Sequence, residues 1–372
     1  TPEVAVGDIP TNLAHHIDLY DAASANDTSL VVFPELSLTG YTLQDLVAHP
    51  SILRGATQAL QLFAEHTKGK NTAAVVGLPF QEGNALYNCA AVVSEGEVRG
   101  IVPKQHLPTY NEFYEKRWYQ TWGARTTTTV QLGSARVPFG RDQLFQIGSQ
   151  YVGIEICEDL WVPEQPSINL VANGATIIAN PSASPEAVAK ASYRRGLVAH
   201  TAGRLATGYV YSSASPTEST AEIVMSGHAL INELGTPLAE RAPFSQQGPL
   251  LFADIDAAHI QHDRLKATNF PSRHDIVATP TYVTPSQATL ERAIDPHPFV
   301  PKGSAEAITE RFDTILNIQA TGLAMRLRSA SIEKVVLGLS GGLDSTLALL
   351  AAIQAAQVLG KKPGELIHTL TM

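Results

Sequence analysis

Glu35, Lys104 and Cys157 are residues of types that carry out nucleophilic chemistry, and each stands where a predicted strand ends. The strands are predicted from short apolar runs at 29–33, 98–102 and 151–156. In α/β sheets, functional side chains gather at the carboxyl ends of strands. We therefore expect these three side chains to lie close together and to form a reactive site.

Together these residue types can cleave an amide bond. A free thiol has a pKa of about 8.5, so only a few per cent of it is thiolate at neutral pH. A carboxylate can take the thiol proton during attack, and a nearby ammonium can stabilise the tetrahedral oxyanion. Cysteine, glutamate and lysine therefore make an amide-cleaving set that needs no histidine, with Cys157 as its nucleophile.

Each of the three residues also has a simpler interpretation. A cysteine in an apolar strand is more often a small buried hydrophobe, and Cys89, within the apolar stretch 87–92, fits that description. Glu35 could begin a helix, and Lys104 could be a solvated lysine after a hairpin. It is the joint pattern of the three that favours catalysis.

A second candidate site is the loop Ser340-Gly341-Gly342-Leu343-Asp344-Ser345, which lies between a predicted strand at 334–339 and an Ala/Leu-rich helix at 345–359. Glycines let a ligand approach the backbone closely, and the N–H groups at a helix start face an anion. The loop does not end in Gly-Lys-Ser/Thr and so is not a Walker sequence. The simpler alternative is a chance Gly-Gly turn before a helix.

The elements that must position these residues are predicted from periodicity and turn residues. Up to about residue 255, hairpins, strands and helices alternate, which is typical of an α/β fold with a mixed sheet. Helices are predicted at 12–25, with Asn12 as the capping residue, at 51–68 and at 186–202. The remaining predictions are a helix-like segment at 168–172, strands at 73–79, 175–179, 208–211, around 223, at 228–231 and at 250–255, hairpins 86–93/98–102 and 144–147/151–156, and a loop at 180–185.

The last part of the chain has a weaker apolar periodicity at first and then a new set of elements. Residues 260–305 contain scattered Pro and His and show little periodicity, which indicates a connector. An amphipathic helix at 306–327 and the strand at 334–339 then predict the opening βαβ unit of a second domain. The chain begins without Met and stops inside a strand-like run at 366–372, so we expect it to be a piece of a longer protein.

The composition narrows the function classes. A chain of 372 residues fits two domains, and a net charge of −9 spread along it argues against nucleic-acid binding. No apolar run is long enough for a membrane helix. Two cysteines cannot make a disulfide framework, so a reducing, cytoplasmic location is expected.

Three short motifs resemble the signatures of the nitrilase (carbon–nitrogen hydrolase) superfamily: Phe33-Pro34-Glu35-Leu36, Pro103-Lys104 and Glu155-Ile156-Cys157-Glu158-Asp159. Gly7-Asp8 with Asn12 is similar to the segment that follows the family's first strand. The resemblance runs to about residue 255. It implies a four-layer αββα sandwich, a thioester on Cys157, Glu35 as general base and Lys104 at the oxyanion.

The tract 104–115 looks very like the glutaminase domains of glutamine-dependent NAD synthetases. That resemblance implies that five residues bind glutamine: Tyr110, Phe113, Glu158, Ser184 and Lys190. Tyr110, Ser184 and Lys190 would hold its α-amino and α-carboxylate ends, although Arg would be as natural as Lys190 for a bidentate carboxylate contact. The alternative is ordinary polarity of surface loops.

The Ser-Gly-Gly-x-Asp-Ser loop resembles the pyrophosphate loop of ATP pyrophosphatases, which form doubly wound parallel α/β domains. The resemblance implies that ATP binds at Gly338, Leu339, Ser340, Gly341, Gly342, Leu343, Asp344 and Ser345. Mg²⁺ is expected with ATP, and no metal ligand is assigned. The expected domains are a glutaminase at 1–259, a connector at 260–305 and the start of the synthetase domain at 306–372.

This layout resembles that of the glutamine-dependent NAD synthetases, which use ammonia from glutamine. It implies that ammonia from Cys157 is channelled to ATP-dependent amidation of deamido-NAD, giving NAD, AMP and diphosphate. The expected partners are these small molecules and further copies of the chain, with no nucleic acid and no membrane. Two alternatives stay open: an amidase for another amide fused to a different ATP pyrophosphatase, and a non-catalytic scaffold.

Overall fold

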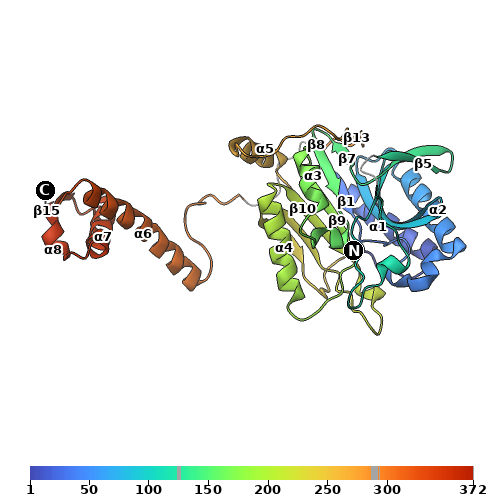
Figure 1. Ribbon diagram of the computed structural model, residues 1–372, viewed down its shortest axis with the longest axis horizontal. Helices are drawn as coiled ribbons and strands as arrows, with labels where there is room; N and C mark the ends of the chain where they lie inside the picture. The colour runs from blue at the N-terminus through green and yellow to red at the C-terminus, as the bar shows by residue number, and fades with distance from the viewer. Residues whose placement is uncertain (124–126, 286–291, 293, 372) are drawn as a thin grey trace. The chain divides into compact units, whose positions relative to one another are not determined.

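The computed structural model describes residues 1–123, 127–285, 292 and 294–371. The chain divides into two compact units, Thr1–Arg292 and Ala293–Met372 (Figure 1). None of the helices in this described part is long and apolar enough to span a membrane. Each unit has its own hydrophobic core.

The first unit contains a sheet whose described strands run in the order β1-β2-β3-β4-β6-β5. The chain forms a meander from β2 to β4, and its second turn lies at Glu95 and Gly96, where both φ angles are positive, at 47° and 81°. Such turns match the twist of antiparallel strands. The strands are β1 (Leu30–Val32), β2 (Ala73–Glu82), β3 (Ala85–Ser94), β4 (Glu97–Pro103), β5 (Thr128–Leu132) and β6 (Ala135–Phe139).

The second sheet of this unit has the order β12-β11-β10-β9-β8-β7-β13 among the described residues. Its central strands β8, β9 and β10 are parallel, and most of the outer pairs are antiparallel, so the sheet is mixed as predicted. The strands are β7 (Leu144–Ile147), β8 (Gln150–Ile154), β9 (Ile177–Ser182), β10 (Gly208–Ser213), β11 (Ala229–Glu233), β12 (Thr236–Arg241) and β13 (Thr279–Pro280).

The two sheets pack face to face between two layers of helices. Val75 and Val92 of the first sheet share one core with Val152 and Ile154 of the second. Helices α1 (Ile9–Ser24) and α2 (Pro50–His66) cover the outer face of the first sheet, and α3 (Pro166–Ala172) and α4 (Lys190–Arg204) cover the outer face of the second. In Figure 1, α2 and α4 lie on opposite sides of the sheets. The predicted four-layer αββα sandwich is confirmed.

Several local predictions need correction. Asp8, not Asn12, caps α1, because Pro10 stands in the first turn and the Asp8 carboxylate accepts the N–H of Thr11 at 3.3 Å. Residues 180–182, predicted as loop, continue β9 because they pair with β10. Helix α4 begins at Lys190 rather than at 186. No strand is present around 223 or at 250–255 in the described residues.

Short elements complete the unit. They are the 3-10 helices η1 (Tyr41–Ala48), η2 (Glu115–Arg117), η3 (Cys157–Leu160) and η4 (Pro216–Glu218), and helix α5 (Ala257–Lys266). Within the predicted connector, α5 belongs to the first unit and β13 pairs with β7. Residues 286–291 and 293 of that connector lie outside the described residues.

The second unit begins with a long helix and a small parallel sheet. Its elements are α6 (Ala305–Ser329), β14 (Val335–Leu339), α7 (Leu343–Val358), α8 (Pro363–Leu366) and β15 (Ile367–Thr371). Strands β14 and β15 are parallel and are connected through α7. Ala320 and Ala324 of α6 pack against Ala355 of α7, which lets the two helices approach closely. The predicted strand–loop–helix order is therefore present.

Candidate active site

A buried ion-pair cluster lies where β1 and β4 end. Nζ of Lys104 is 2.6 Å from Oε1 of Glu35 and 2.7 Å from Oε1 of Glu115. The side chains of Lys104 and Glu35 have no exposed surface. Lys104 is held at the end of β4 because its own N–H donates to the carbonyl of Asn88 on β3 at 2.8 Å. The sheet thus brings together two of the three predicted catalytic residues.

Two further residues complete the hydrogen bonds of this cluster. Nδ2 of Asn88 donates to Oε1 of Glu35 at 2.6 Å, and the hydroxyl of Tyr41 donates to Oε1 of Glu115 at 2.9 Å. Oε2 of Glu35 is buried and has no hydrogen-bond partner among the described residues. One oxygen of Glu35 is therefore engaged by Lys104 and Asn88, and the other has lone pairs left to accept a proton.

Cys157 begins η3, three residues after β8 ends, and is buried. Its φ of 47° lies in the left-handed region, which is unusual for a residue other than glycine. Its N–H donates to Oδ1 of Asn180 on β9 at 3.3 Å. A backbone in this region persists only where its surroundings fix it, and such residues cluster at active sites.

Asp159 fixes this turn to the segment that follows Lys104. Its carboxylate accepts the N–H of Ile156 at 2.9 Å and the N–H of His106 at 2.8 Å. Because Asp159 is two residues from Cys157 and His106 is two residues from Lys104, one buried carboxylate joins the two catalytic segments. Asp159 belongs to the predicted motif 155–159, but its sequence position did not indicate that it joins these two segments.

The electrostatics of the cluster favour a neutral thiol at rest. Burial raises the pKa of Cys157, the charge of Glu35 raises it further, and Lys104 and the amide of Ala183 lower it. Burial also lowers the pKa of Lys104, but Glu115 and Glu35 outweigh it and hold that pKa well above its ordinary value. Lys104 therefore stays charged, and Cys157 needs a base to become a thiolate.

The cluster of Glu35, Lys104 and Glu115 carries two carboxylates for one ammonium. Burial, opposed by Lys104 and reinforced by Glu35, raises the pKa of Glu115 to about 7. Glu115 was not among the predicted catalytic residues, because it begins the short helix η2 after a loop without periodicity. The signal that could have found it is its place at the end of the tract 104–115. Asn88, which contacts Glu35, was marked in the sequence only as a polar residue in an otherwise apolar strand.

Four of the five residues expected to bind glutamine lie together. The hydroxyl of Tyr110 donates to both oxygens of Glu158, at 2.8 and 3.0 Å, and its ring packs edge-on against Phe113. Nζ of Lys190 lies 5.9 Å from the centre of the Phe113 ring and 5.7 Å from that of Trp161. Burial lowers the pKa of Lys190, and a thiolate at Cys157 would raise it, so Lys190 lies within electrostatic reach of the thiol.

Ser184, the fifth residue, has other contacts. Its N–H donates to Oγ of Ser213 at 3.1 Å, and its Oγ accepts from Nη2 of Arg194 at 3.4 Å. It is buried and follows the end of β9 by two residues. No hydrogen bond joins Ser184 to the other four within the described residues. The sequence did not indicate its partner, the fully buried Arg194.

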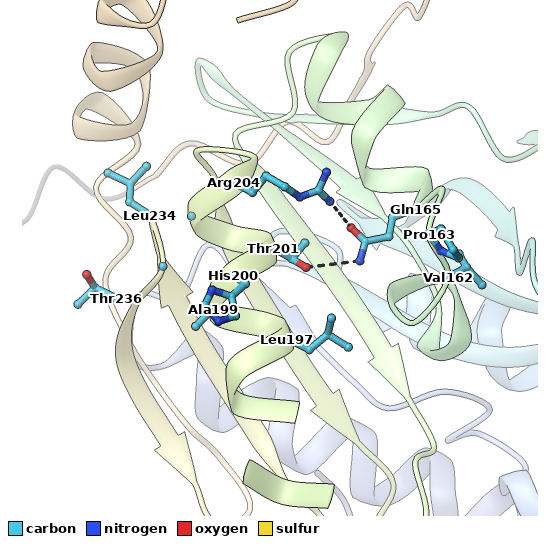
Figure 2. A pocket seen from close by; sticks show the side chains of 12 residues that line it. Val162, Pro163, Gln165, Leu197, Ala199, His200, Thr201, Arg204, Leu234 and Thr236 are labelled. Carbon is cyan, nitrogen blue, oxygen red and sulfur yellow. Dashed lines mark hydrogen bonds between the residues drawn. The ribbon is translucent and has the colours of Figure 1, made fainter. Parts of the chain in front are cut away.

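A pocket of about 340 Å³ adjoins the cluster. Tyr41 of the cluster and Phe113 of the predicted glutamine set both line it, together with Thr220 and Ile223 from the loop before β11. A larger hollow of about 780 Å³ lies elsewhere, between α4, the segment after η3 and the turn from β11 to β12. Figure 2 shows Arg204 and Thr201 of α4 pointing toward Gln165 in this hollow. Neither Cys157 nor any residue of the ion-pair cluster lines the hollow.

The loop between β14 and α7 forms an open helix start in the second unit. Gly342 is the N-cap of α7, and Gly341 has a φ of 81° with no atom within 4 Å of where a Cβ would stand. Oγ of Ser340 and Oγ of Ser345 are 3.3 Å apart. The predicted ATP-binding residues 338–345 thus lie at one strand end and one helix start, as an anion site requires.

Residues 3–265 match the family model described as carbon–nitrogen hydrolase. The chain belongs to the carbon–nitrogen hydrolase family. This family assignment covers the unit that holds Glu35, Lys104 and Cys157, and it agrees with the resemblance inferred from the three motifs.

Relatives of this carbon–nitrogen hydrolase chain align beyond the family domain. The glutamine-dependent NAD(+) synthetase of Mycobacterium tuberculosis is 34% identical over 99% of the chain and 56% of that relative. The synthetase of the same name from Thermotoga maritima is 30% identical over 96% of the chain and 57% of that relative. The chain therefore spans about half the length of the curated relatives it matches.

A solved structure is similar across both units. The crystal structure of a glutamine-dependent NAD(+) synthetase from Cytophaga hutchinsonii matches the carbon–nitrogen hydrolase chain with a TM-score of 0.62 and 25% identity. The match covers 97% of the chain and 52% of that protein.

Proposed function

We propose that the chain is the glutaminase portion, and the first part of the ATP-dependent portion, of a glutamine-dependent NAD synthetase. One observation carries this proposal: relatives with that name align with 99% of the chain, so the similarity includes the second unit as well as the hydrolase unit. A hydrolase that acts alone would have no need of the Ser340–Ser345 loop.

In the proposed reaction, Cys157 is the nucleophile. Oε2 of Glu35, buried and without a partner among the described residues, takes the thiol proton as Sγ attacks the side-chain amide carbon of glutamine. The ammonium of Lys104 stabilises the oxyanion, an interaction whose removal typically costs about 10²–10³ in rate. The intermediate collapses, Glu35 returns the proton to the leaving nitrogen, and ammonia departs to leave a thioester.

Hydrolysis of the thioester regenerates the enzyme. Glu35, again a carboxylate, takes a proton from water, whose oxygen attacks the thioester carbon, and Lys104 stabilises the second oxyanion. The carbon–sulfur bond breaks, the thiolate regains the proton from Glu35, and glutamate is released. Glu35 acts as the base in both halves of the reaction: first toward the neutral thiol of Cys157, and then toward water.

Tyr110, Phe113, Glu158 and Lys190 are proposed to select glutamine over simpler amides. Glu158 would bind the α-ammonium with Tyr110 holding it in place, and Lys190 would bind the α-carboxylate. Burial lowers the pKa of Lys190, and an ammonium so desolvated is strongly attractive to an anion. Ser184 would contribute through its hydroxyl, which Arg194 orients.

The second unit is proposed to bind ATP and to use the ammonia. Gly341 and Gly342 are exposed, and the N–H of Gly342 donates to Oγ of Ser340 at 3.4 Å. This helix start, with the hydroxyls of Ser340 and Ser345, would fit a polyphosphate. ATP would supply an adenylyl group that activates the carboxylate of deamido-NAD. No group of three His, Cys, Asp or Glu side chains that could hold a metal is present in the described residues. Mg²⁺, oligomer formation and a cytoplasmic location belong to this proposal.

Release of glutamate and ammonia from glutamine tests the glutaminase portion directly. We expect turnover by the wild-type protein, none by Cys157→Ala, and near wild-type turnover by Cys89→Ala, which removes the other buried thiol. Aliphatic amides and carbamoyl amines serve as competing substrates. Turnover of these but not of glutamine would identify an amidase of another specificity, and no turnover of any amide would favour a scaffold.

A further inference from the structure

Glu218 is a deeply buried carboxyl that the reaction above does not use. It ends η4 and has no exposed surface. Its Oε2 accepts the backbone N–H of Tyr41 at 2.5 Å, although 177 positions separate the two residues. Its Oε1 is buried and has no hydrogen-bond partner in the described part of the chain. Burying such a group is costly, so its position calls for a physical reason.

Tyr41 connects Glu218 to the ion-pair cluster. The Tyr41 hydroxyl donates to Oε1 of Glu115, and the same oxygen accepts from Nζ of Lys104. Tyr41 is therefore held at both ends, by Glu218 at its backbone and by Glu115 at its ring. A change at Glu218 reaches Lys104 through only two intervening residues.

The packing of the residue before Tyr41 favours the hydrogen bond between the Tyr41 N–H and Glu218. Gly40 has a φ of 89°, and a Cβ there would stand 3.3 Å from the backbone of Val6 and 3.4 Å from Oε2 of Glu218. Glycine adopts this backbone conformation without the steric strain that other residues would have. The turn at Gly40 therefore presents the N–H of Tyr41 to Glu218, and a side chain at this position would be crowded by Val6 and Glu218.

We infer that Glu218 is a positioning residue: by holding the Tyr41 backbone it keeps the Tyr41 hydroxyl on Glu115 and so keeps Lys104 aligned with the oxyanion. The inference rests on the proposed amide-cleaving function. Thr220 and Ile223, on the loop that follows Glu218, line the 340 Å³ pocket together with Tyr41. Glu218 thus fixes this wall of the pocket to the catalytic cluster.

Three variants test the role of Glu218 in glutamine hydrolysis. Glu218→Met fills the space but cannot accept the N–H, and kcat should fall about tenfold, while KM should stay within about twofold because Tyr41 acts on Lys104. Glu218→Gln keeps an acceptor oxygen and should restore kcat to within about threefold of wild type. If Glu218→Met does not fold, kcat is measured for Glu218→Ala instead.

A double-mutant cycle separates positioning from simple destabilisation. Tyr41→Phe should lower kcat by itself, and adding Glu218→Met should lower it no further, because both act through one hydroxyl. Glu233→Ala is the matched control: Glu233 is a buried carboxylate that accepts the N–H of Asp256 at 2.5 Å, outside the cluster. It should lower stability without lowering kcat.

The reaction of Cys157 with iodoacetamide gives a readout that needs no glutamine. Glu218→Met should slow this alkylation and Glu218→Gln should not, measured by mass spectrometry of the folded protein. If glutamine is not hydrolysed by wild type, the proposed function fails while alkylation still tests Glu218. Unchanged kcat and alkylation in Glu218→Met, or fully multiplicative losses with Tyr41→Phe, would overturn the inference.

Discussion

Nζ of Lys104 lies 2.6 Å from Oε1 of Glu35, and neither side chain has any exposed surface. The two residues follow the ends of β1 and β4 in the same sheet, and their contact depends on the fold because 69 positions separate them. With water excluded, the charge of Lys104 acts strongly on whatever lies beside it. That property suits a group that must stabilise an oxyanion at the moment it forms.

Replacing Lys104 should cost both activity and stability. Lys104→Met would leave the carboxylates of Glu35 and Glu115 buried without a cation, and breaking such a pair typically costs about 3–5 kcal/mol. We expect glutamine hydrolysis to fall by at least about 10²-fold. Urea unfolding and glutamate release measure the two effects.

Lys70→Met provides the control for Lys104. Lys70 pairs with Asp21, but both side chains are partly exposed, and surface pairs contribute about 0–1 kcal/mol. The variant should keep wild-type activity and nearly wild-type stability. If Lys104→Met were as active as Lys70→Met, Lys104 would have no part in the reaction.

Removing the carboxylate of Asp159 should uncouple the Cys157 turn from the segment after Lys104. Asp159→Ala would leave the N–H groups of Ile156 and His106 without their acceptor, at a cost of about 1–3 kcal/mol for each buried group. Activity should fall at least about tenfold, whereas Asp159→Asn, which keeps one acceptor oxygen, should lose less. Equal activities for the two variants would show that these hydrogen bonds do not position Cys157.

The contact between Glu35 and Lys104 could be predicted from sequence because strand ends are marked by apolar runs and because a sheet brings such ends together. Cys157 likewise follows the end of a predicted strand, but its strand β8 belongs to the other sheet. The position of Glu115 could not be predicted, since η2 follows a long loop whose path is fixed by contacts such as the hydrogen bond from the Glu115 N–H to the carbonyl of Pro108. Loops have no periodicity from which their path can be inferred.

The wrong predictions have similar causes. The apolar run at 250–255 was predicted as a strand. Instead Ile255 covers Gly208 of β10 and Leu250 packs on the first core, so these two side chains are used without strand pairing. Asn12 was predicted as a cap because of its residue type. It is instead buried inside α1, where Nδ2 donates to the carbonyl of Leu38. Tertiary contacts decided both cases.

Stability should depend on pH through Glu155. Burial raises the pKa of Glu155 to about 7, although hydrogen bonds from Tyr209 and Ser167 oppose it. The folded protein therefore keeps this proton up to about pH 7, whereas the unfolded chain loses it near pH 4.3. The unfolded state binds fewer protons between these values, so the contribution of Glu155 to stability decreases as pH rises.

Glu155→Gln should remove this decrease. Relative to wild type, the variant should gain up to about 3 kcal/mol between pH 5 and pH 7, measured by urea unfolding at both values. Glu65→Gln, an exposed substitution on α2, is the control and should not alter the slope. A constant difference between Glu155→Gln and wild type across this range would mean that Glu155 is ionised in the folded protein.

Lys190 should govern the affinity for the substrate carboxylate. Lys190→Ala should raise KM for glutamine by about 10²-fold, in the range of a lost charge-assisted contact, with a smaller effect on kcat. Lys190→Arg should keep KM within about tenfold, because a guanidinium also binds carboxylates. Arg195→Ala, which removes an exposed neighbour paired with Glu240, should leave KM unchanged. Lowered kcat with unchanged KM in Lys190→Ala would remove Lys190 from substrate binding.

The central claim is that Cys157 attacks the amide of glutamine. Intact-mass and peptide mass spectrometry after rapid acid quenching of a reaction with glutamine tests it most directly. We predict one glutamyl group, the substrate less ammonia, on Cys157, and none in Cys157→Ala. Continued release of ammonia from glutamine by Cys157→Ala, or a glutamyl group on another residue, would contradict the account.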